Sequence, residues 1–393
     1  MKKILTLGPN TFLWLNERKG LIYNSKNYKS LEFNLTPGIS KLCNILLDYN
    51  HLYSVQYDDC ADTSIKDFIE GVVSIDAGYV HEVGQSVLSL PPLLKIQHDM
   101  NFLKKRGDEF QDFALRYLSR LIVFVGGSCD ENIYYKQTLY PVNSQDTLRC
   151  QEIICFLKGI MSPYLSEIVI VFSDIQKYND LMMLTNYLGT LKSNITICIN
   201  SEEENVPIKE ILKCGDNIKI KYVYKPGRFN KLHIHAEDAN VVHTFLISSE
   251  DNYVEFEKIY NKHTTDNLEV IPVFDGRNFE FIKHNVFLSK IEILSSELTK
   301  RDIFIHQVLN NNFFGTLYIM PDGNIYSDLT SPALGDINDC IYDIILKEIS
   351  LNYSWRQIRN SGQCQLCLYR ELCPSPSIYE KMMNLRCICI ANK

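Results

Sequence analysis

The sequence predicts an α/β protein in three parts, with a parallel sheet in the middle. First, continuous apolar runs alternate with segments of helical period through the central part of the chain, which is typical of parallel strands buried on both faces. Second, residues 1–83 contain shorter strand-like runs followed by two helical segments. Third, five of the 13 cysteines lie within residues 364–393, which indicates a site of its own at that end.

Residues 1–83 are predicted to form a small winged-helix-like module. Pro37 and Gly38 open a first helix, and a brief extended piece leads to a second helix, for which Thr63 is the expected N-cap. The Pro91-Pro92 pair marks residues 84–92 as a linker. The expected strands are Phe12–Asn16, Leu21–Asn24 and Ser30–Asn34.

Residues 95–285 are predicted to form a parallel sheet with crossover helices. Six strands are too few for a complete eightfold barrel, so an open sheet and a partial barrel both remain possible. Helical period appears at 147–160, 178–191 and 252–262. The expected strands are 121–125, 168–172, 195–199, 218–224, 243–247 and 268–274.

Residues 286–393 are predicted to form the third part, which begins with a β-hairpin. Strand-like residues on either side of Asp322-Gly323, between Gly315 and Ser327, predict the hairpin. A helix around 336–351 follows, and then the cysteines.

Composition disfavours two classes of function. The formal charge is −7, from 40 basic and 47 acidic residues, without a basic block of the kind that binds nucleic acid. No run approaches 18 apolar residues, so we expect no membrane-spanning helix. The N-terminal apolar run stops at Pro9-Asn10, too early for an export signal, and we therefore expect a cytoplasmic protein.

The C-terminal cysteines are predicted to bind a metal. Cys364 and Cys367 form a CxxC pair, Cys373 follows, and Cys387 or Cys389 would be the fourth ligand. Four thiolates suit zinc and an iron–sulfur cluster equally, so both remain open. A redox CxxC normally begins a helix after a strand. This pair instead follows the polar loop 359–362, which favours a metal site over a redox pair. The other eight cysteines are expected to be small buried hydrophobes.

This arrangement resembles the SPASM domain of radical-S-adenosylmethionine (radical-SAM) peptide maturases. The resemblance is carried by the hairpin with Gly323 and by Cys364-x2-Cys367-x5-Cys373 with a late cysteine. It implies one retained auxiliary 4Fe–4S cluster, with one zinc as the alternative. The family's second auxiliary cluster has lost its ligands, because Asp328 and Ser377 stand where two of its cysteines would be and no cysteine precedes the hairpin at Phe313-Phe314.

Residues 120–275 resemble the partial (β/α)6 barrel of radical-SAM enzymes. In that family the loop after the first strand carries Cys-x3-Cys-x2-Cys, but here Cys129 would be followed by Ile133 and Lys136. Phe172-Ser173-Asp174 replaces the Gly-Gly-Glu that contacts the methionine amine of SAM. The resemblance therefore implies that the SAM-cleaving cluster is lost, and no catalytic or SAM-binding residue is assigned.

The N-terminal module resembles the PqqD-like recognition element (RRE) of such maturases. In that fold a leader peptide adds as a strand, here to Ser30–Asn34, and packs against the last helix, here Thr63–Val72. As a whole the chain is most similar to the pseudo-radical-SAM proteins of Bacteroidales peptide-modification systems. The resemblance implies a protein that binds a precursor peptide and assists or regulates its maturation, together with an active maturase or another pathway enzyme as partner.

Two alternatives remain open for the function. The chain could be an active maturase or oxidoreductase that uses the remaining cluster, or a zinc-stapled interaction protein. Elsewhere, His233 and His235 could form a metal pair but are expected to be surface residues. Gly126-Gly127 is expected to form a tight strand exit, and the aromatic loop from Tyr134 to Pro141 could either hold a peptide or pack as a lid.

Overall fold

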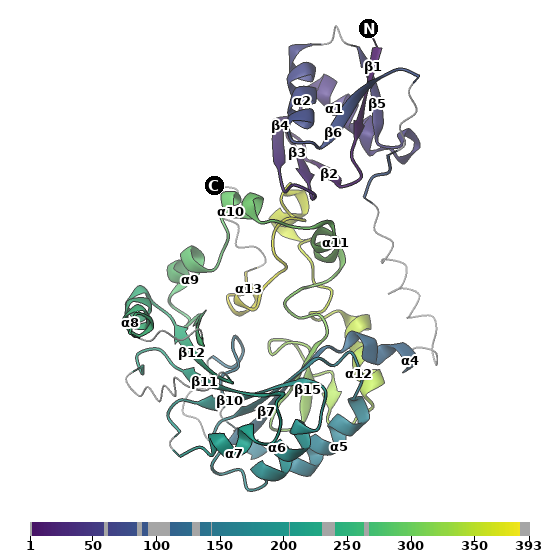
Figure 1. Cartoon of the computed structure of the whole chain (residues 1–393). Coiled ribbons are helices and arrows are strands. Elements are labelled where there is room, and N and C mark those ends of the chain that lie inside the picture. Colours follow the sequence, from purple (N-terminus) through teal and green to yellow (C-terminus); the bar gives the residue numbers. More distant parts are fainter. Residues whose placement is uncertain are drawn as a thin grey trace.

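The computed structural model describes residues 2–58, 62–84, 89–92, 111–127, 134–142, 144–203, 205–229, 240–262 and 267–385. Figure 1 shows a small N-terminal module at one end of the molecule and a large sheet at the other. Several short helices and the C-terminal segment lie between them. No helix in the described part of the chain is long and apolar enough to cross a membrane.

The N-terminal module contains two three-stranded antiparallel sheets packed with two helices. One sheet has the order β5-β1-β6 and the other β2-β3-β4. The helices place Ile39, Leu46, Phe68 and Val72 in a core that they share with Leu5 and other strand residues. The elements are β1 (Lys2–Leu7), β2 (Thr11–Leu15), β3 (Lys19–Asn24), β4 (Ser30–Asn34), α1 (Pro37–Leu47), η1 (Tyr49–His51), β5 (Ser54–Asp58), α2 (Thr63–Ser74) and β6 (Gly78–Glu82).

The predicted strands and helices of this module are present, with two additions and one correction. Strands β1 and β6 were not predicted, and β1 is the central strand of its sheet. The N-cap of α2 is Asp62, whose side chain accepts the amide of Ser64 at 3.3 Å. Thr63 is the first helical residue, so the prediction of Thr63 as the cap was wrong, because the carboxylate one position earlier accepts the free amide.

The central region is a parallel sheet in which all six predicted strands are present in chain order. Each strand pairs in parallel with the next one. Because helices connect these strands, the region belongs to the α/β class, as predicted. The strands are β7 (Arg120–Gly127), β9 (Glu167–Phe172), β10 (Asn194–Asn200), β11 (Ile218–Tyr224), β12 (Val241–Ile247) and β13 (Leu268–Pro272). The helices between them are α5 (Cys150–Ile160), α6 (Leu181–Gly189), α7 (Ile208–Leu212) and α8 (Glu250–Tyr260).

The predicted hairpin extends this sheet. Strand β14 (Thr316–Ile319) pairs in parallel with β7, and β15 (Asn324–Tyr326) and β16 (Gly335–Asp336) follow antiparallel. Helix α12 (Ile341–Leu351) and the fully buried Trp355 belong to the same hydrophobic core as the parallel strands. The hairpin and the central strands thus form one continuous layer, and β8 (Ser144–Thr147) pairs with β7 beside it.

The two faces of the sheet are covered differently. Helices α5 to α7 lie against one face, as Figure 1 shows, and pack with the strands in the large core. The opposite, inner face carries a smaller apolar cluster and lies toward the C-terminal segment. The elements not yet given are α4 (Gln111–Ala114), η3 (Leu115–Tyr117), α9 (Phe279–Asn285), α10 (Lys290–Ser295), α11 (Lys300–Val308), η4 (Gly362–Leu366) and α13 (Ile378–Met382).

Candidate functional site

The predicted metal ligands Cys364, Cys367 and Cys373 lie at two consecutive turns. Cys364 is buried within η4, and the Cys367 amide donates to the Cys364 carbonyl at 3.2 Å. Burial raises the pKa of Cys373 to about 12; the Arg359 guanidinium opposes this effect, and the Cys364 and Cys367 thiols add to it. None of the three cysteines is in a disulfide.

The donor chemistry of these thiols fits a soft metal centre. Three cysteines with a fourth ligand would suit zinc or a 4Fe–4S cluster, and a bound metal would deprotonate the thiols. Among the described residues, no three His, Cys, Asp or Glu side chains already stand close enough together to hold a metal ion. The expected fourth ligands, Cys387 and Cys389, lie outside the described residues. The metal site thus stays a prediction.

An ion pair lies directly beside the cysteines. The Arg359 guanidinium donates to both carboxylate oxygens of Glu380, at 2.8 and 3.1 Å, and both side chains are nearly buried. Arg359 also donates to the carbonyl of Pro374, next to Cys373. Glu380 completes a capping box with Ser377, the N-cap of α13. Ser377, which stands where the resembled family has a cysteine, therefore begins a helix instead.

Asp328 stands at another of these positions and forms a second buried ion pair. Its carboxylate accepts Lys381 Nζ at 2.7 Å, Ser331 Oγ at 2.6 Å and the Thr330 amide at 2.8 Å. The Lys381 ammonium also lies 4.6 Å from the centre of the Phe313 ring, just before the hairpin. Helix α13 thus contacts all three places where the resemblance expects cysteines: Lys381 contacts Asp328 and the Phe313 ring, and Glu380 binds Ser377.

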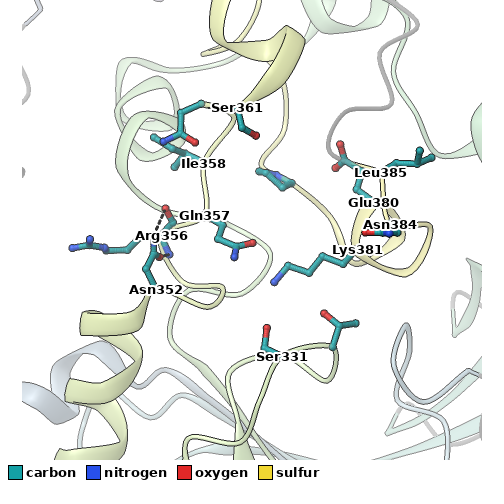
Figure 2. A pocket seen from close by; sticks show the side chains of 13 residues that line it. Ser331, Asn352, Arg356, Gln357, Ile358, Ser361, Glu380, Lys381, Asn384 and Leu385 are labelled. Atoms are coloured by element: carbon teal, nitrogen blue, oxygen red, sulfur yellow. Dashed lines mark hydrogen bonds between the residues drawn. The ribbon is translucent and has the colours of Figure 1, made fainter.

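A polar cavity of about 630 Å³ lies next to these two ion pairs. In Figure 2, Gln357, Lys381 and Ser331 surround its middle, whereas the Arg356 guanidinium points away from Lys381. Lys381 and Glu380 are paired with Asp328 and Arg359, so most of the polar groups that remain to bind a ligand are neutral amides and hydroxyls. The lining residues are Thr330, Ser331, Asn352, Arg356, Gln357, Ile358, Asn360, Ser361, Pro376, Glu380, Lys381, Asn384 and Leu385.

The inner face of the sheet is filled by the chain itself. Tyr134, Tyr140 and Val142 are buried there against residues of the parallel strands. The Gln137 side chain donates to the Phe274 carbonyl at 2.8 Å and accepts the Phe274 amide at 2.6 Å. The segment that follows the first parallel strand is thereby fixed to the end of the last one. Of the two predictions for this loop, the packed one is confirmed.

The glycine pair at the end of β7 forms the tight exit that was predicted. Gly126 has a φ of 111°, and a Cβ there would come within 2.3 Å of the Asp146 carbonyl oxygen. Ser173 Oγ donates to the Gly126 carbonyl, so this position in the expected SAM motif binds backbone instead. Cys129 and Ile133 lie outside the described residues, as do His233 and His235.

The scattered cysteines were predicted as buried hydrophobes. Cys43, Cys150 and Cys198 are buried, as predicted. The prediction was wrong for Cys155 and Cys340, which are exposed on the surface groove between α5 and the start of α12. Cys214 is half-buried, and Cys60 lies outside the described residues.

Sequence reasoning missed the surface by which the N-terminal module docks on the rest of the chain. The Tyr23 hydroxyl donates to the Leu298 carbonyl at 3.0 Å and accepts the Leu298 amide at 2.9 Å. The run Leu21–Tyr23 is fully buried, with its residues divided between this surface and the module core. That unbroken apolar run was the available signal for a strand covered on both faces. The docking cluster contains Phe12, Leu21, Tyr23, Ile293, Ile303, Leu368, Tyr369 and Leu372.

The open edge of β4 lies beside this docking surface. Glu32, in the middle of β4, accepts Lys290 of α10 with N···O distances of 2.6 and 2.7 Å. Burial raises the pKa of Glu32, but hydrogen bonds from Lys290 and Tyr369 outweigh burial and lower it below its usual range. Glu32 of the strand and Tyr369, which lies between Cys367 and Cys373, thus share Lys290 as a neighbour.

No family model matches the chain, and no curated protein matches it significantly. Among solved structures, SuiB of Streptococcus suis bound to S-adenosylmethionine aligns at 12% identity and a TM-score of 0.47, covering 97% of both chains. SuiB bound to its precursor peptide SuiA gives 11% identity and 0.48, covering 97% of this chain and 98% of SuiB. BtrN in complex with AdoMet and 2-DOIA gives 11% and 0.34, covering 65% of this chain and 92% of BtrN.

Proposed function

We propose that this chain binds a ribosomally made precursor peptide and assists or regulates its maturation without cleaving SAM itself. The observation that carries the proposal is the open edge of β4 on the N-terminal module. In the described residues β4 pairs with β3 alone, so one side of its backbone has no partner strand. An unpaired strand edge is the surface that a peptide strand joins in β-augmentation.

The hydrogen bonds of β4 define which backbone groups face that edge. The Leu35 amide donates to the Arg18 carbonyl, and the Lys29 carbonyl accepts the Asn24 amide. The backbone groups of odd-numbered residues therefore point toward β3. Because backbone groups alternate along a strand, Ser30, Glu32 and Asn34 face the open side. Helix α2 borders the strand, since a Cβ on Gly71 would lie 2.9 Å from Leu31 Cδ2. A leader peptide would thus bind between β4 and α2.

The residues present do not fit a SAM-cleaving cluster. Cys129 is followed by Ile133 and Lys136 in place of the second and third thiolates. The inner face of the sheet is covered by Tyr134 and Tyr140 of the chain itself. The proposal is therefore a non-catalytic role similar to that of the Bacteroidales pseudo-radical-SAM proteins, beside an active maturase.

The polar cavity supports peptide binding beyond the leader. Two of its three charged residues, Glu380 and Lys381, are paired within the protein, and the guanidinium of the third, Arg356, points away from Lys381. Side-chain amides of Gln357, Asn360 and Asn384 can donate to and accept from a peptide backbone. We propose that an extended part of the precursor lies here, while Cys364, Cys367 and Cys373 hold a metal that supplies a structural cross-link or an electron-transfer centre.

The test is a titration of the full chain with the precursor peptide encoded beside its gene, followed by fluorescence anisotropy. We expect saturable binding, and at least tenfold weaker binding for Asn34→Pro. Proline removes an amide that faces the open edge, so the β3–β4 ladder is kept. Asn34→Ala is the matched control and should bind like the wild type. Binding no stronger than to a scrambled peptide, or equal binding by both variants, would contradict the proposal.

A further inference from the structure

The cysteine segment 367–373 is itself the surface on which the N-terminal module docks. Leu368, Tyr369 and Leu372 are buried in the docking cluster, and Cys367 and Cys373 pack against it from the segment's two ends. The predicted second and third metal ligands therefore enclose the residues that the module contacts.

A chain of contacts leads from this segment to the open edge of β4. The Lys290 ammonium lies 5.4 Å from the centre of the Tyr369 ring and binds the Glu32 carboxylate in the middle of β4. Tyr369 also lies close enough to Glu32 to lower the pKa of its carboxyl. A movement of the Tyr369 ring would therefore change the position of Lys290 and, through it, of Glu32 in the strand to which the peptide is proposed to add.

A metal would restrict this segment at both ends. Fixing Cys367 and Cys373 to one centre closes a short loop, and a loop held in its bound conformation docks at a smaller entropic cost. Leu368, Tyr369 and Leu372 would then already stand in the positions that receive Phe12 and Leu21. Metal binding should thus strengthen docking without any new contact between the metal and the module.

We propose that a metal bound by Cys364, Cys367 and Cys373 stabilises docking of the N-terminal module and, through Tyr369, Lys290 and Glu32, orders β4 for peptide binding. This inference rests on the proposed function and adds its regulation. By linkage, a peptide on β4 raises the affinity of the cysteines for metal by the same factor that metal raises peptide affinity.

Docking has a specific reporter in the Leu298 amide, which donates to Tyr23 Oη at 2.9 Å across the interface. The experiment is hydrogen exchange on the full chain, freed of metal by a chelator and then given zinc alone. We expect zinc to slow exchange of Leu298, and of Leu31 and Phe33 in β4, by about fivefold or more. Amides of β9, far from the interface, should be unchanged.

Two lysine variants separate docking from coupling. Lys290→Met keeps the aliphatic stem but removes the charge that binds Glu32, so zinc should still protect Leu298 while its effect on Leu31 and Phe33 disappears. Lys300→Met is the matched control, because Lys300 donates across the same interface to the Pro9 carbonyl at 2.8 Å and not to β4. It should keep the zinc effect on β4.

The outcomes distinguish this inference from the proposed function. Zinc that binds at about one per chain and leaves Leu298 and β4 unchanged would overturn the coupling, as would a chain that binds neither zinc nor iron. Peptide affinity is measured separately in the titration above. A chain that binds peptide equally well with and without metal would keep the proposed function and lose the inference.

Discussion

Asp328 and Lys381 form an ion pair across the C-terminal region, with 2.7 Å between Oδ2 and Nζ. Asp328 is fully buried, and only 13% of the Lys381 side chain is exposed. The pair joins the loop after β15 to α13, which also reaches the parallel sheet through a 2.7 Å hydrogen bond from Tyr379 to the Pro272 carbonyl. These contacts attach α13 to the loop after β15 and to the end of β13.

Lys381→Met is expected to lower the free energy of unfolding by about 3–5 kcal/mol, because it leaves a buried carboxylate without its counter-charge. Urea denaturation at neutral pH measures this loss. The double variant Asp328→Asn/Lys381→Met is the control and should recover a large part of it. If Lys381→Met alone were as stable as the double variant, the pair would not be closed in solution.

The Asp328–Lys381 pair should also make folding stability fall at acidic pH. Burial raises the pKa of Asp328, but Lys381 and the hydroxyls of Ser331 and Thr330 outweigh burial and lower the pKa below the ordinary 3.8. Its stabilising effect is therefore complete above pH 3.8 and is lost as pH falls through the lowered value. Wild type should lose more stability than Asp328→Asn over that window, measured by thermal melts.

Glu203, which follows β10, should make folding stability depend on pH in the opposite direction. Burial is the main cause that raises its pKa from 4.5 to about 7, and Asp174 adds to the rise. The folded state thus holds a proton that the unfolded state releases, so stability falls as pH rises from 4.5 to about 7. Glu203→Gln should be about 1–2 kcal/mol more stable than wild type at pH 8 and equal to it near pH 4. A variant that is less stable at pH 8 would contradict this assignment.

Metal content tests the cysteine site. After anaerobic purification we expect about four irons with matching sulfide, or about one zinc, per chain. Cys364→Ser and Cys373→Ser should lose most of this metal, whereas Cys155→Ser, which changes an exposed thiol on α5, should keep it. About eight irons would mean a second cluster and would contradict the proposed loss of SAM chemistry.

The filled inner face predicts that the chain does not bind SAM. Isothermal titration with SAM should show no saturable heat, because the Tyr134–Val142 segment covers the face on which a ligand would lie.

Gln137→Glu should destabilise the fold by about 1–3 kcal/mol, since a carboxylate cannot donate to the Phe274 carbonyl. Thr138→Ala, in the same segment, should cost less. Tight SAM binding by wild type would show that this segment leaves the sheet.

Much of the fold could be predicted from the sequence because the signals are local. Six apolar runs and their helical neighbours predicted the central parallel strands, and Asp322-Gly323 predicted the turn before β15. Strand β1 was missed because Lys2–Leu7 has the charge and apolar order of an N-terminal targeting segment. The exposure of Cys155 was missed because neighbouring residues do not show which face of α5 meets the sheet.

The sequence by itself determined the α/β class, the positions of the six central strands and the spacing of Cys364, Cys367 and Cys373, since each depends on residues near one another in the chain. Tertiary structure alone decided that Tyr134 and Tyr140 fill the inner face, that Asp328 meets Lys381, and that the cysteine segment receives Tyr23. These contacts join residues up to hundreds of positions apart. No period or spacing in the chain encodes such partners, because they are selected by the packing of surfaces that exist only after the elements have formed.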